Sequence, residues 1–143
     1  MGAGIILMRF TDAGPQFLML KGRRSCVWSF PKGHPEEVDK GSPLRTAVRE
    51  TQEETGLVNG RDYTIVGDAI RFGKRPYWLG IVHGSPAVQL CWHEHVEWAW
   101  NSRNEIAEMT TNTDVRAWVK KTLGPSNFTR LVDSVATQLV AAH

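Results

Sequence analysis

One stretch decides the fold of this chain, and it covers residues 44–57, LRTAVRETQEETGL. Apolar and small side chains recur in it at three- and four-residue steps, which predicts one buried face of an α-helix. Ser42 is suited to cap the start of this helix, Pro43 to its first turn and Gly56 to its end. The sequence therefore predicts a capped helix over residues 44–56.

A second face of the same helix carries three acids, Glu50, Glu53 and Glu54. These spacings bring like charges together, and each such pair costs an isolated helix about 0.2–0.5 kcal/mol. A divalent cation bound between the carboxylates would turn the repulsion into attraction, and magnesium prefers carboxylate oxygens. The acidic face therefore predicts a metal site rather than a solvated surface.

Length and composition favour one domain without a strongly charged partner. The chain has 143 residues, 22% charged residues and a formal net charge of +2, so no strong signal indicates nucleic acid. Cys26 and Cys91 are too few for a disulfide scaffold, which suits a reducing, cytoplasmic compartment. The sequence shows no signal peptide and no apolar run that would span a membrane. We expect a single domain over residues 1–143 and leave its oligomeric state open.

Hydrophobic alternation predicts strands on both sides of the central helix. The expected strands cover residues 4–10, 16–21, 27–30, 63–72, 76–83, 87–91 and 96–100. Helical periodicity returns towards the C-terminus, with a short turn at 106–109 and helices over 113–123 and 128–142. Strands around one helix, closed by C-terminal helices, predict a mixed α/β sandwich.

The acidic helix and the loop before it resemble the Nudix box. That box reads Gly, five residues, Glu, seven residues, Arg-Glu, an apolar residue, any residue, Glu-Glu, any residue, Gly and an apolar residue. Residues 49–57 match its second half, and Gly33 matches its first glycine if the loop carries two extra residues. The isolated glutamate of the box would then fall at Gly41. The acids of this loop that can replace it are Glu36, Glu37 and Asp39.

The resemblance implies a fold, an activity and a metal site. The fold would be the Nudix α/β/α sandwich, with a mixed sheet and a central box helix. The activity would be hydrolysis of a nucleoside diphosphate linked to another group, X, by attack of water on phosphorus. The ligands of a magnesium ion, or alternatively of manganese, would be Glu50, Glu53, Glu54 and the carbonyl of Gly33.

The resemblance also implies catalytic roles for other residues. Arg49 lies four residues before Glu53 and would orient its carboxylate. The general base would be a box glutamate, Glu53 or Glu54, or an acid on a later loop. For that later acid Glu94 is the first candidate and Glu97 the second.

Three further segments resemble asymmetric diadenosine tetraphosphate hydrolases. They are WSFPKGH at 28–34, KRPYWL at 74–79 and HEH at 93–95, followed by Trp100. The resemblance implies a nucleotide-type substrate, diadenosine tetraphosphate or another dinucleoside polyphosphate. A base stacked on a flat side chain gains roughly 1–3 kcal/mol. The expected substrate-binding residues are Lys32, Lys74 and Arg75 for phosphate, His34 for phosphate or a structural hydrogen bond, and Tyr77, Trp78 or Trp98 for a base.

Three alternatives remain at the level of sequence. An RNA 5′ pyrophosphohydrolase would need a broader basic or aromatic track. A diphosphoinositol polyphosphate phosphohydrolase would need more lysine and arginine around its more anionic substrate. A Nudix-fold module that senses a nucleotide without cleaving it would have no need of the complete acidic triplet.

Overall fold

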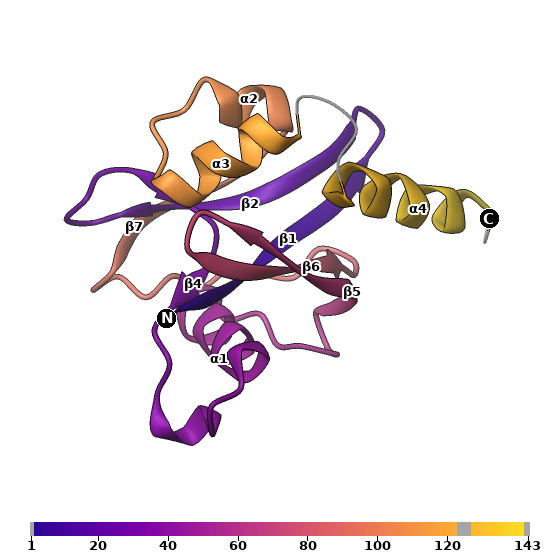
Figure 1. Ribbon diagram of the computed structural model, residues 1–143. Coiled ribbons are helices and arrows are strands. Elements are labelled where there is room, and N and C mark those ends of the chain that lie inside the picture. The colour runs from indigo at the N-terminus through magenta and orange to yellow at the C-terminus, as the bar shows by residue number, and fades with distance from the viewer. Residues whose placement is uncertain (1, 123–126, 142–143) are drawn as a thin grey trace.

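A computed structural model describes residues 2–122 and 127–141 of the chain (Figure 1). In these residues seven strands form one sheet. The strands are β1 (Ala3–Thr11), β2 (Gly14–Gly22), β3 (Trp28–Ser29), β4 (Lys32–Gly33), β5 (Tyr63–Phe72), β6 (Arg75–Val82) and β7 (His95–Asn101). The helices are α1 (Pro43–Thr55), α2 (Arg103–Ala107), α3 (Thr113–Lys121) and α4 (Asn127–Ala141), with a 3-10 turn, η1, at Glu37–Asp39.

The sheet is mixed because one of its pairs is parallel. Its main order is β3-β2-β1-β6-β5, while β4 pairs with β1 and β7 pairs with β2. β1 and β6 run parallel, with Gly4 opposite Tyr77, and the other paired strands are antiparallel. β1 and β6 therefore lie in the interior of the sheet, where both of their faces can be covered.

Helices cover both faces of this sheet (Figure 1). On one face α1 buries Ala47 against a cluster of apolar strand residues that are fully enclosed, Ala3, Ile5, Leu7, Leu18 and Leu20. On the other face α2 and α3 bury Ile106, Val115 and Trp118 against a second cluster that includes Phe17, Phe30 and Phe72. The predicted α/β/α sandwich is confirmed.

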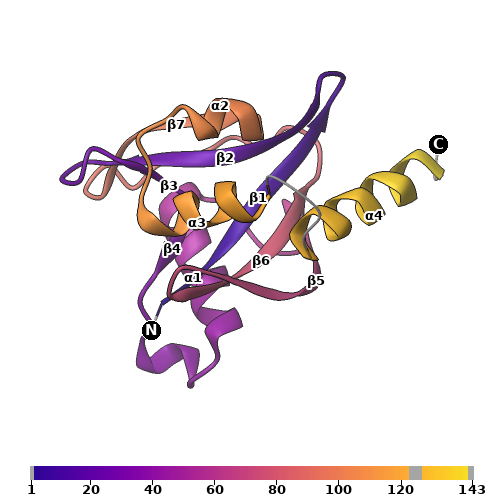
Figure 2. The same cartoon turned by 45° about the horizontal axis from the view of Figure 1, so that its top comes forward.

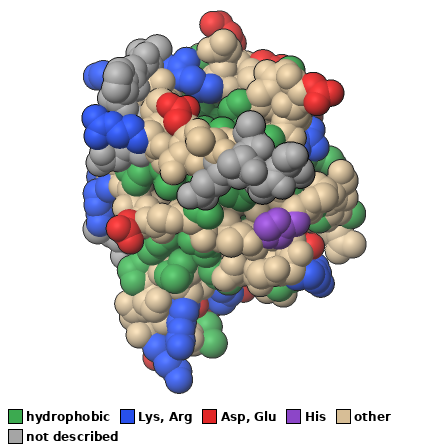
Figure 3. All heavy atoms as spheres, turned by 90° about the vertical axis from the view of Figure 1, so that its right-hand side faces the viewer, with side chains coloured by type: hydrophobic (Ala, Val, Ile, Leu, Met, Phe, Trp, Pro, Cys, Tyr) green, Lys and Arg blue, Asp and Glu red, His purple; other side chains and the backbone are tan. Residues whose placement is uncertain are grey.

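The fourth helix lies at one edge of the molecule. α4 extends beside β5 (Figures 1 and 2), and Val135 joins the core of the α2–α3 face. Both acidic and basic side chains occur on the side of the molecule shown in Figure 3, as a net charge of only +2 would suggest. None of the helices in the described ranges is long and apolar enough to cross a membrane.

The central helix has the ends that its sequence predicts. The side chain of Ser42 accepts a hydrogen bond from the backbone N–H of Arg45, 3.2 Å away, and Pro43 occupies the first turn. Gly56 ends the helix with a φ of +77°, a left-handed conformation that favours glycine. Local sequence therefore determines where α1 begins and ends.

Two predictions about the other elements need comment. Residues 87–91 are not a strand, because the N–H of Gln89 donates to the carbonyl of Thr55 at the end of α1, at 2.8 Å, and not to a strand. Val88 and Leu90 still pack against the core on the α1 side, which explains the alternating pattern. The predicted ends at residues 123 and 142, and the stop at 124–125, lie outside the described residues.

Candidate active site

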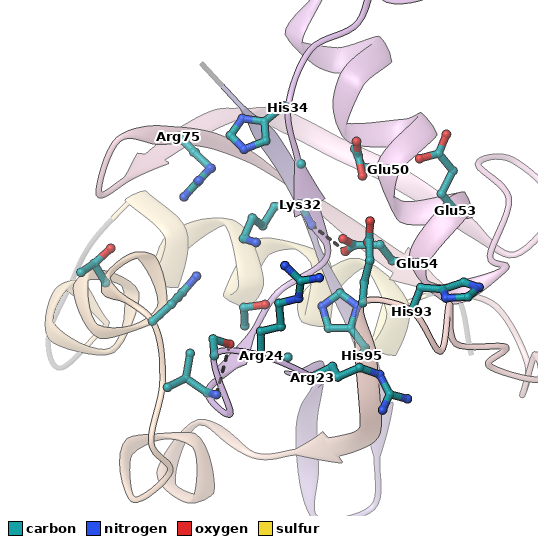
Figure 4. Close-up of a pocket in the computed structure, with 18 of the residues that line it drawn as sticks. Arg23, Arg24, Lys32, His34, Glu50, Glu53, Glu54, Arg75, His93 and His95 are labelled. Atoms are coloured by element: carbon teal, nitrogen blue, oxygen red, sulfur yellow. Dashed lines mark hydrogen bonds between the residues drawn. The ribbon is translucent and has the colours of Figure 1, made fainter.

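A cavity of about 950 Å³ opens beside α1 (Figure 4). Three structural units supply most of its walls: α1 with β4, the loop that follows β2, and the loop that precedes β7. The start of α3 and the first residue of β6 complete it. Its titratable lining residues are Arg23, Arg24, Lys32, His34, Glu36, Glu50, Glu53, Glu54, Arg75, His93, Glu94 and His95.

The acids of this cavity form two groups. In each group the donor atoms lie within 4.8 Å of one another; the first consists of Glu36, Glu50 and Glu53, and the second of Glu54, Glu94 and His95. Burial raises the pKa of both Glu50 and Glu54 above the ordinary value of a glutamate. The charged forms of Glu50 and Glu54 are therefore unfavourable unless a cation compensates them.

β4 fixes two of the acids. The backbone N–H of Lys32 donates to Oε1 of Glu54 at 3.1 Å. A Cβ atom on the next residue, Gly33, would lie 2.0 Å from Cδ of Glu50, so glycine is required for this close approach. Because β4 pairs with the start of β1, the acids of α1 are held against the sheet.

Arg49 connects the acids from the side of α1. Its Nε and Nη2 each donate to Asp39 at 2.9 Å, and Asp39 is only 2% exposed. The hydrogen bonds from Arg49 hold the pKa of this carboxyl far below its ordinary value. Nη1 lies 2.6 Å from Glu36, 3.1 Å from Glu50 and 3.2 Å from Glu53. One guanidinium thus contacts four carboxylates, and its single positive charge offsets only part of their negative charge.

The three loop acids have different positions. Asp39 lies beneath Arg49 and also accepts hydrogen bonds from the hydroxyl of Thr46 and the N–H of Glu36. Glu36 turns towards the acids of α1, and Glu37 is exposed at the start of η1. Sequence could not distinguish them, because the 3-10 turn decides which acid faces inward.

Basic side chains line another part of the cavity. Lys32 and Arg75 lie on the opposite side of Glu54 from Glu53 in Figure 4, and Arg24 lies below Lys32. Arg23 and Arg24 also line the cavity, although no motif in the sequence marks them as site residues. The backbone N–H of Arg23 donates to the carbonyl of Glu94 at 2.8 Å, which joins the two loops at the rim. The Nε of Arg23 also donates to the carbonyl of Trp92 at 2.6 Å, so long-range contacts, and not a local motif, bring the pair to the site.

Some residues expected at the site lie elsewhere. Lys74, expected to contact phosphate, is exposed in the β5–β6 turn, and Glu97, the second candidate for the general base, is exposed on β7 opposite Lys21; neither lines the cavity. Trp98 is 44% exposed and borders a separate depression of about 400 Å³. Among the described residues no tryptophan or tyrosine lines the cavity.

The structure corrects the expectation that Tyr77 stacks on a base. Its side chain is 2% exposed, its ring packs near Phe30 and Phe72, and its hydroxyl donates to Asp114. Trp78 packs on the opposite face of the sheet, against the core beside α1. Tyr77 is enclosed, Trp78 is partly buried on the other face of β6, and neither ring lines the cavity.

His95 is the histidine that the structure places closest to the acids. It is 5% exposed, and within the described part of the chain its Nδ1 has no hydrogen-bond partner. Burial, and secondarily the charge of Lys32, lower the pKa of His95, which favours the neutral imidazole. His93 lies at the exposed rim of the same loop.

The donor set fits a hard divalent cation. Carboxylate oxygens predominate in both groups, and oxygen ligands are what magnesium and manganese prefer. A cation would also relieve the unfavourable burial of Glu50 and Glu54 as anions. The residues brought together thus match a metal-dependent hydrolytic site in composition and charge.

Comparisons with known proteins agree with this composition. The model of the NUDIX domain family matches residues 1–122. The asymmetrical bis(5′-nucleosyl)-tetraphosphatase of Sus scrofa is 31% identical over 121 residues, which cover 78% of this chain and 81% of that protein. The protein of the same name from Rattus norvegicus is 30% identical over 116 residues, or 74% of this chain and 77% of its own.

A solved structure supports the fold. The Ap4A hydrolase of C. elegans, in a binary complex, has a TM-score of 0.67 and 22% sequence identity, over 98% of this chain and 97% of that chain. At this identity the likeness concerns the fold alone. The family match over residues 1–122 carries the assignment, and the chain is a Nudix hydrolase, a member of the NUDIX domain family.

Proposed function

We propose that this Nudix hydrolase cleaves diadenosine tetraphosphate, or another dinucleoside polyphosphate, with magnesium or manganese at the acids of α1. Two relatives at 30–31% identity bear the name of an asymmetrical bis(5′-nucleosyl)-tetraphosphatase. The supporting observation in the structure is a single cavity with acids along α1 and the basic side chains of Arg23, Arg24, Lys32 and Arg75 around them. That combination suits a chain of phosphates, part of which is bound through metal and part through cations of the protein.

The residues that would hold the metal are Glu50, Glu53, Glu54 and the carbonyl of Gly33. A bound divalent cation supplies charge neutralisation at the phosphate oxygens and lowers the pKa of water. Arg49 keeps Glu50 and Glu53 in place, and the N–H of Lys32 keeps Glu54 in place. These contacts arrange the oxygens before any ligand arrives, so that little reorganisation is needed during the reaction.

Glu94 is our choice for the group that takes the proton from the attacking water. It lies in the cavity within 4.8 Å of Glu54 and His95, on an exposed loop. Glu54 is instead enclosed and bound to the N–H of Lys32, which suits a ligand better than a base. Water adds to a phosphorus, the bond from that phosphorus to a bridging oxygen breaks, and a mononucleotide and a nucleoside triphosphate leave.

A panel of substrates tests this proposal. The purified chain is incubated with magnesium and, in separate reactions, diadenosine tetraphosphate, a 5′-triphosphorylated RNA and a diphosphoinositol polyphosphate, with products separated by chromatography. We expect adenosine triphosphate and adenosine monophosphate from the first compound and much slower turnover of the others. Rapid turnover of another panel member beside an intact dinucleotide would refute the proposed substrate.

Removal of metal and of one acid tests the site. Excess EDTA should abolish turnover, and added magnesium or manganese should restore it. Glu54→Gln should lose nearly all turnover while the circular dichroism spectrum stays that of the native fold. Arg45→Gln is the matched control, because Arg45 is exposed on the same helix and lies outside the cavity. Full activity of Glu54→Gln would exclude the proposed role of that acid.

A further inference from the structure

Arg75 lies at the boundary between the cavity and the core. It is the first residue of β6, its side chain is 25% exposed, and it lines the cavity together with Lys32. Its Nη1 donates to Oδ2 of Asp114 at 2.9 Å, its Nε is buried beside Gly2, and its Nη2 is not buried and makes no hydrogen bond within the described residues. The guanidinium is therefore anchored through Nη1, and the donors that remain for a ligand are those of its terminal nitrogens.

Asp114 is the anchor, and its surroundings leave it little freedom. It lies in the first turn of α3 and is 1% exposed. Its Oδ2 also accepts the hydroxyl of Tyr77, and its Oδ1 packs against the β5–β6 turn, where a Cβ on Gly73 would lie 2.4 Å away. Asp114 is not the cap of α3, because Asn112 accepts the capping hydrogen bond from Val115. Hydrogen bonds from Arg75 and Tyr77, and not a capping role, compensate the burial of this carboxylate.

Burial of a carboxylate is costly unless charge and hydrogen bonds compensate it. A purely structural ion pair would satisfy Asp114 equally well if Arg75 were enclosed on every side. Arg75 instead shares the cavity with Lys32 and with the first residues of α3, Asn112 and Thr113. A planar guanidinium held at one end presents its remaining N–H groups in a fixed orientation, which is the requirement for binding phosphate oxygens.

We propose that Asp114 is a positioning residue that holds Arg75 in the cavity as a contact to the phosphates of the substrate. This inference rests on the proposed function, since it concerns the same cavity. It assigns the wall formed by Arg75 and the start of α3 to the part of the phosphate chain that the metal leaves uncovered. Tyr77 takes part only indirectly, as the second hydrogen-bond donor to Asp114.

Steady-state kinetics with diadenosine tetraphosphate and magnesium test the pair. Loss of a hydrogen bond to a charged group predicts roughly a tenfold or larger rise in KM for Arg75→Gln, with kcat within about twofold of wild type. Asp114→Asn should raise KM in the same way but less. In the double variant the Asp114 change should add nothing, since its effect acts through Arg75.

Controls separate positioning from stability. Arg71→Gln removes a positive charge from the same β5–β6 hairpin at a residue outside the cavity, and its KM should equal that of wild type. Asp114→Glu keeps the charge but displaces its oxygens, and it should raise KM if position matters. Asp114→Glu also replaces Asp114→Asn as the test variant if the latter does not fold, as judged by circular dichroism and thermal unfolding. Equal KM values for Arg75→Gln and wild type would overturn the proposal, and so would additive effects in the double variant.

A binding measurement distinguishes this inference from the proposed function. Isothermal titration with inorganic tripolyphosphate and magnesium probes the phosphate contact without adenosine or cleavage. If wild type cleaves no dinucleotide but binds tripolyphosphate, and both variants weaken binding non-additively, the proposed substrate fails and the role of Asp114 stands. If the dinucleotide is cleaved but neither variant changes KM or tripolyphosphate binding, the proposed substrate stands and the role of Asp114 fails. No binding of tripolyphosphate and no turnover in wild type would overturn both.

Discussion

Two arginines of this chain are each paired with a buried aspartate, and they use the pairing differently. Arg49 donates to Asp39 through Nε and Nη2, to the carbonyl of His34 and to glutamates of α1, so its hydrogen-bonding capacity is taken up within the protein. Arg75 meets Asp114 through Nη1, and its Nη2, which is not buried, makes no hydrogen bond in the described structure. The first arginine holds the acids of the cavity together, and the second keeps donors that no described group uses.

The surroundings of the two pairs explain the difference. Arg49 lies on α1 among carboxylates that repel one another, so every donor finds an acceptor nearby. Arg75 lies at the start of β6, where Asp114 is the acid that it meets. An arginine surrounded by acids therefore uses its N–H donors within the protein, whereas an arginine paired with a single acid keeps N–H donors that can bind an anion.

The largest expected effect belongs to Arg49. Arg49→Gln removes the cation shared by Glu36, Glu50 and Glu53, so the acids should separate and the metal should bind less tightly. A displacement of about 1 Å in an active site can reduce the rate by about 100-fold, and we expect at least that loss in kcat. The measurement is kcat at saturating substrate, together with a magnesium titration of activity. Wild-type kcat and magnesium dependence in this variant would remove the contrast with Arg75.

A smaller effect, measured as stability, should follow from Asp39→Asn. Arg49 lowers the pKa of Asp39 from the ordinary value of 3.8 in the folded protein. A carboxyl with a lowered folded pKa stabilises the fold above its unfolded pKa, and this contribution is lost as pH falls towards the folded pKa. The free energy of unfolding of wild type should therefore decrease as pH falls below about 4, and that of the variant should decrease less.

Urea unfolding at several pH values between 3 and 7 checks this slope. Glu37→Gln is the matched control, because Glu37 is an exposed acid of the same 3-10 turn. Its pH dependence should remain that of wild type. Identical slopes for wild type and Asp39→Asn would mean that the Arg49–Asp39 pair contributes little to acid stability.

The smallest effect should come from Tyr77→Phe, which removes one of the two donors to Asp114 while Arg75 remains. Loss of one hydrogen bond typically lowers the free energy of unfolding by about 1 kcal/mol. Thermal or urea unfolding measures this change, and KM should stay well below that of Arg75→Gln. A KM as high as that of Arg75→Gln would show that the tyrosine, and not the aspartate alone, positions the arginine.

Sequence predicted the features that depend on neighbouring residues. The ends of α1 follow from Ser42, Pro43 and Gly56, and each of these acts within one helical turn. Six of the seven expected strands correspond to strands of the sheet. The strand pattern was wrong at residues 87–91, because the alternating side chains there cover α1 and the sheet while the backbone pairs with the end of α1. Alternation reports burial, and it does not by itself identify a hydrogen-bond partner.

The sequence predicted those parts of the site that belong to a motif. It could not predict the parts that depend on tertiary contacts. The acids of α1 lie in the cavity as one helix face requires, although their catalytic roles stay predictions. Tyr77 and Trp78 alternate across a strand, but sequence does not say that this strand is interior. The sequence did not mark Asp114 as a site residue, because an aspartate is also favoured in the first turn of any helix. Its partners lie 37 and 39 residues away in the chain.

That separation between Arg75 and Asp114 bears on how substrate preference can be transferred between relatives. A chimera that receives only the β5–β6 hairpin would acquire the arginine without its anchor, and one that receives only α3 would bury an aspartate with no cation. Recombination or grafting between such enzymes should therefore succeed only when both segments travel together.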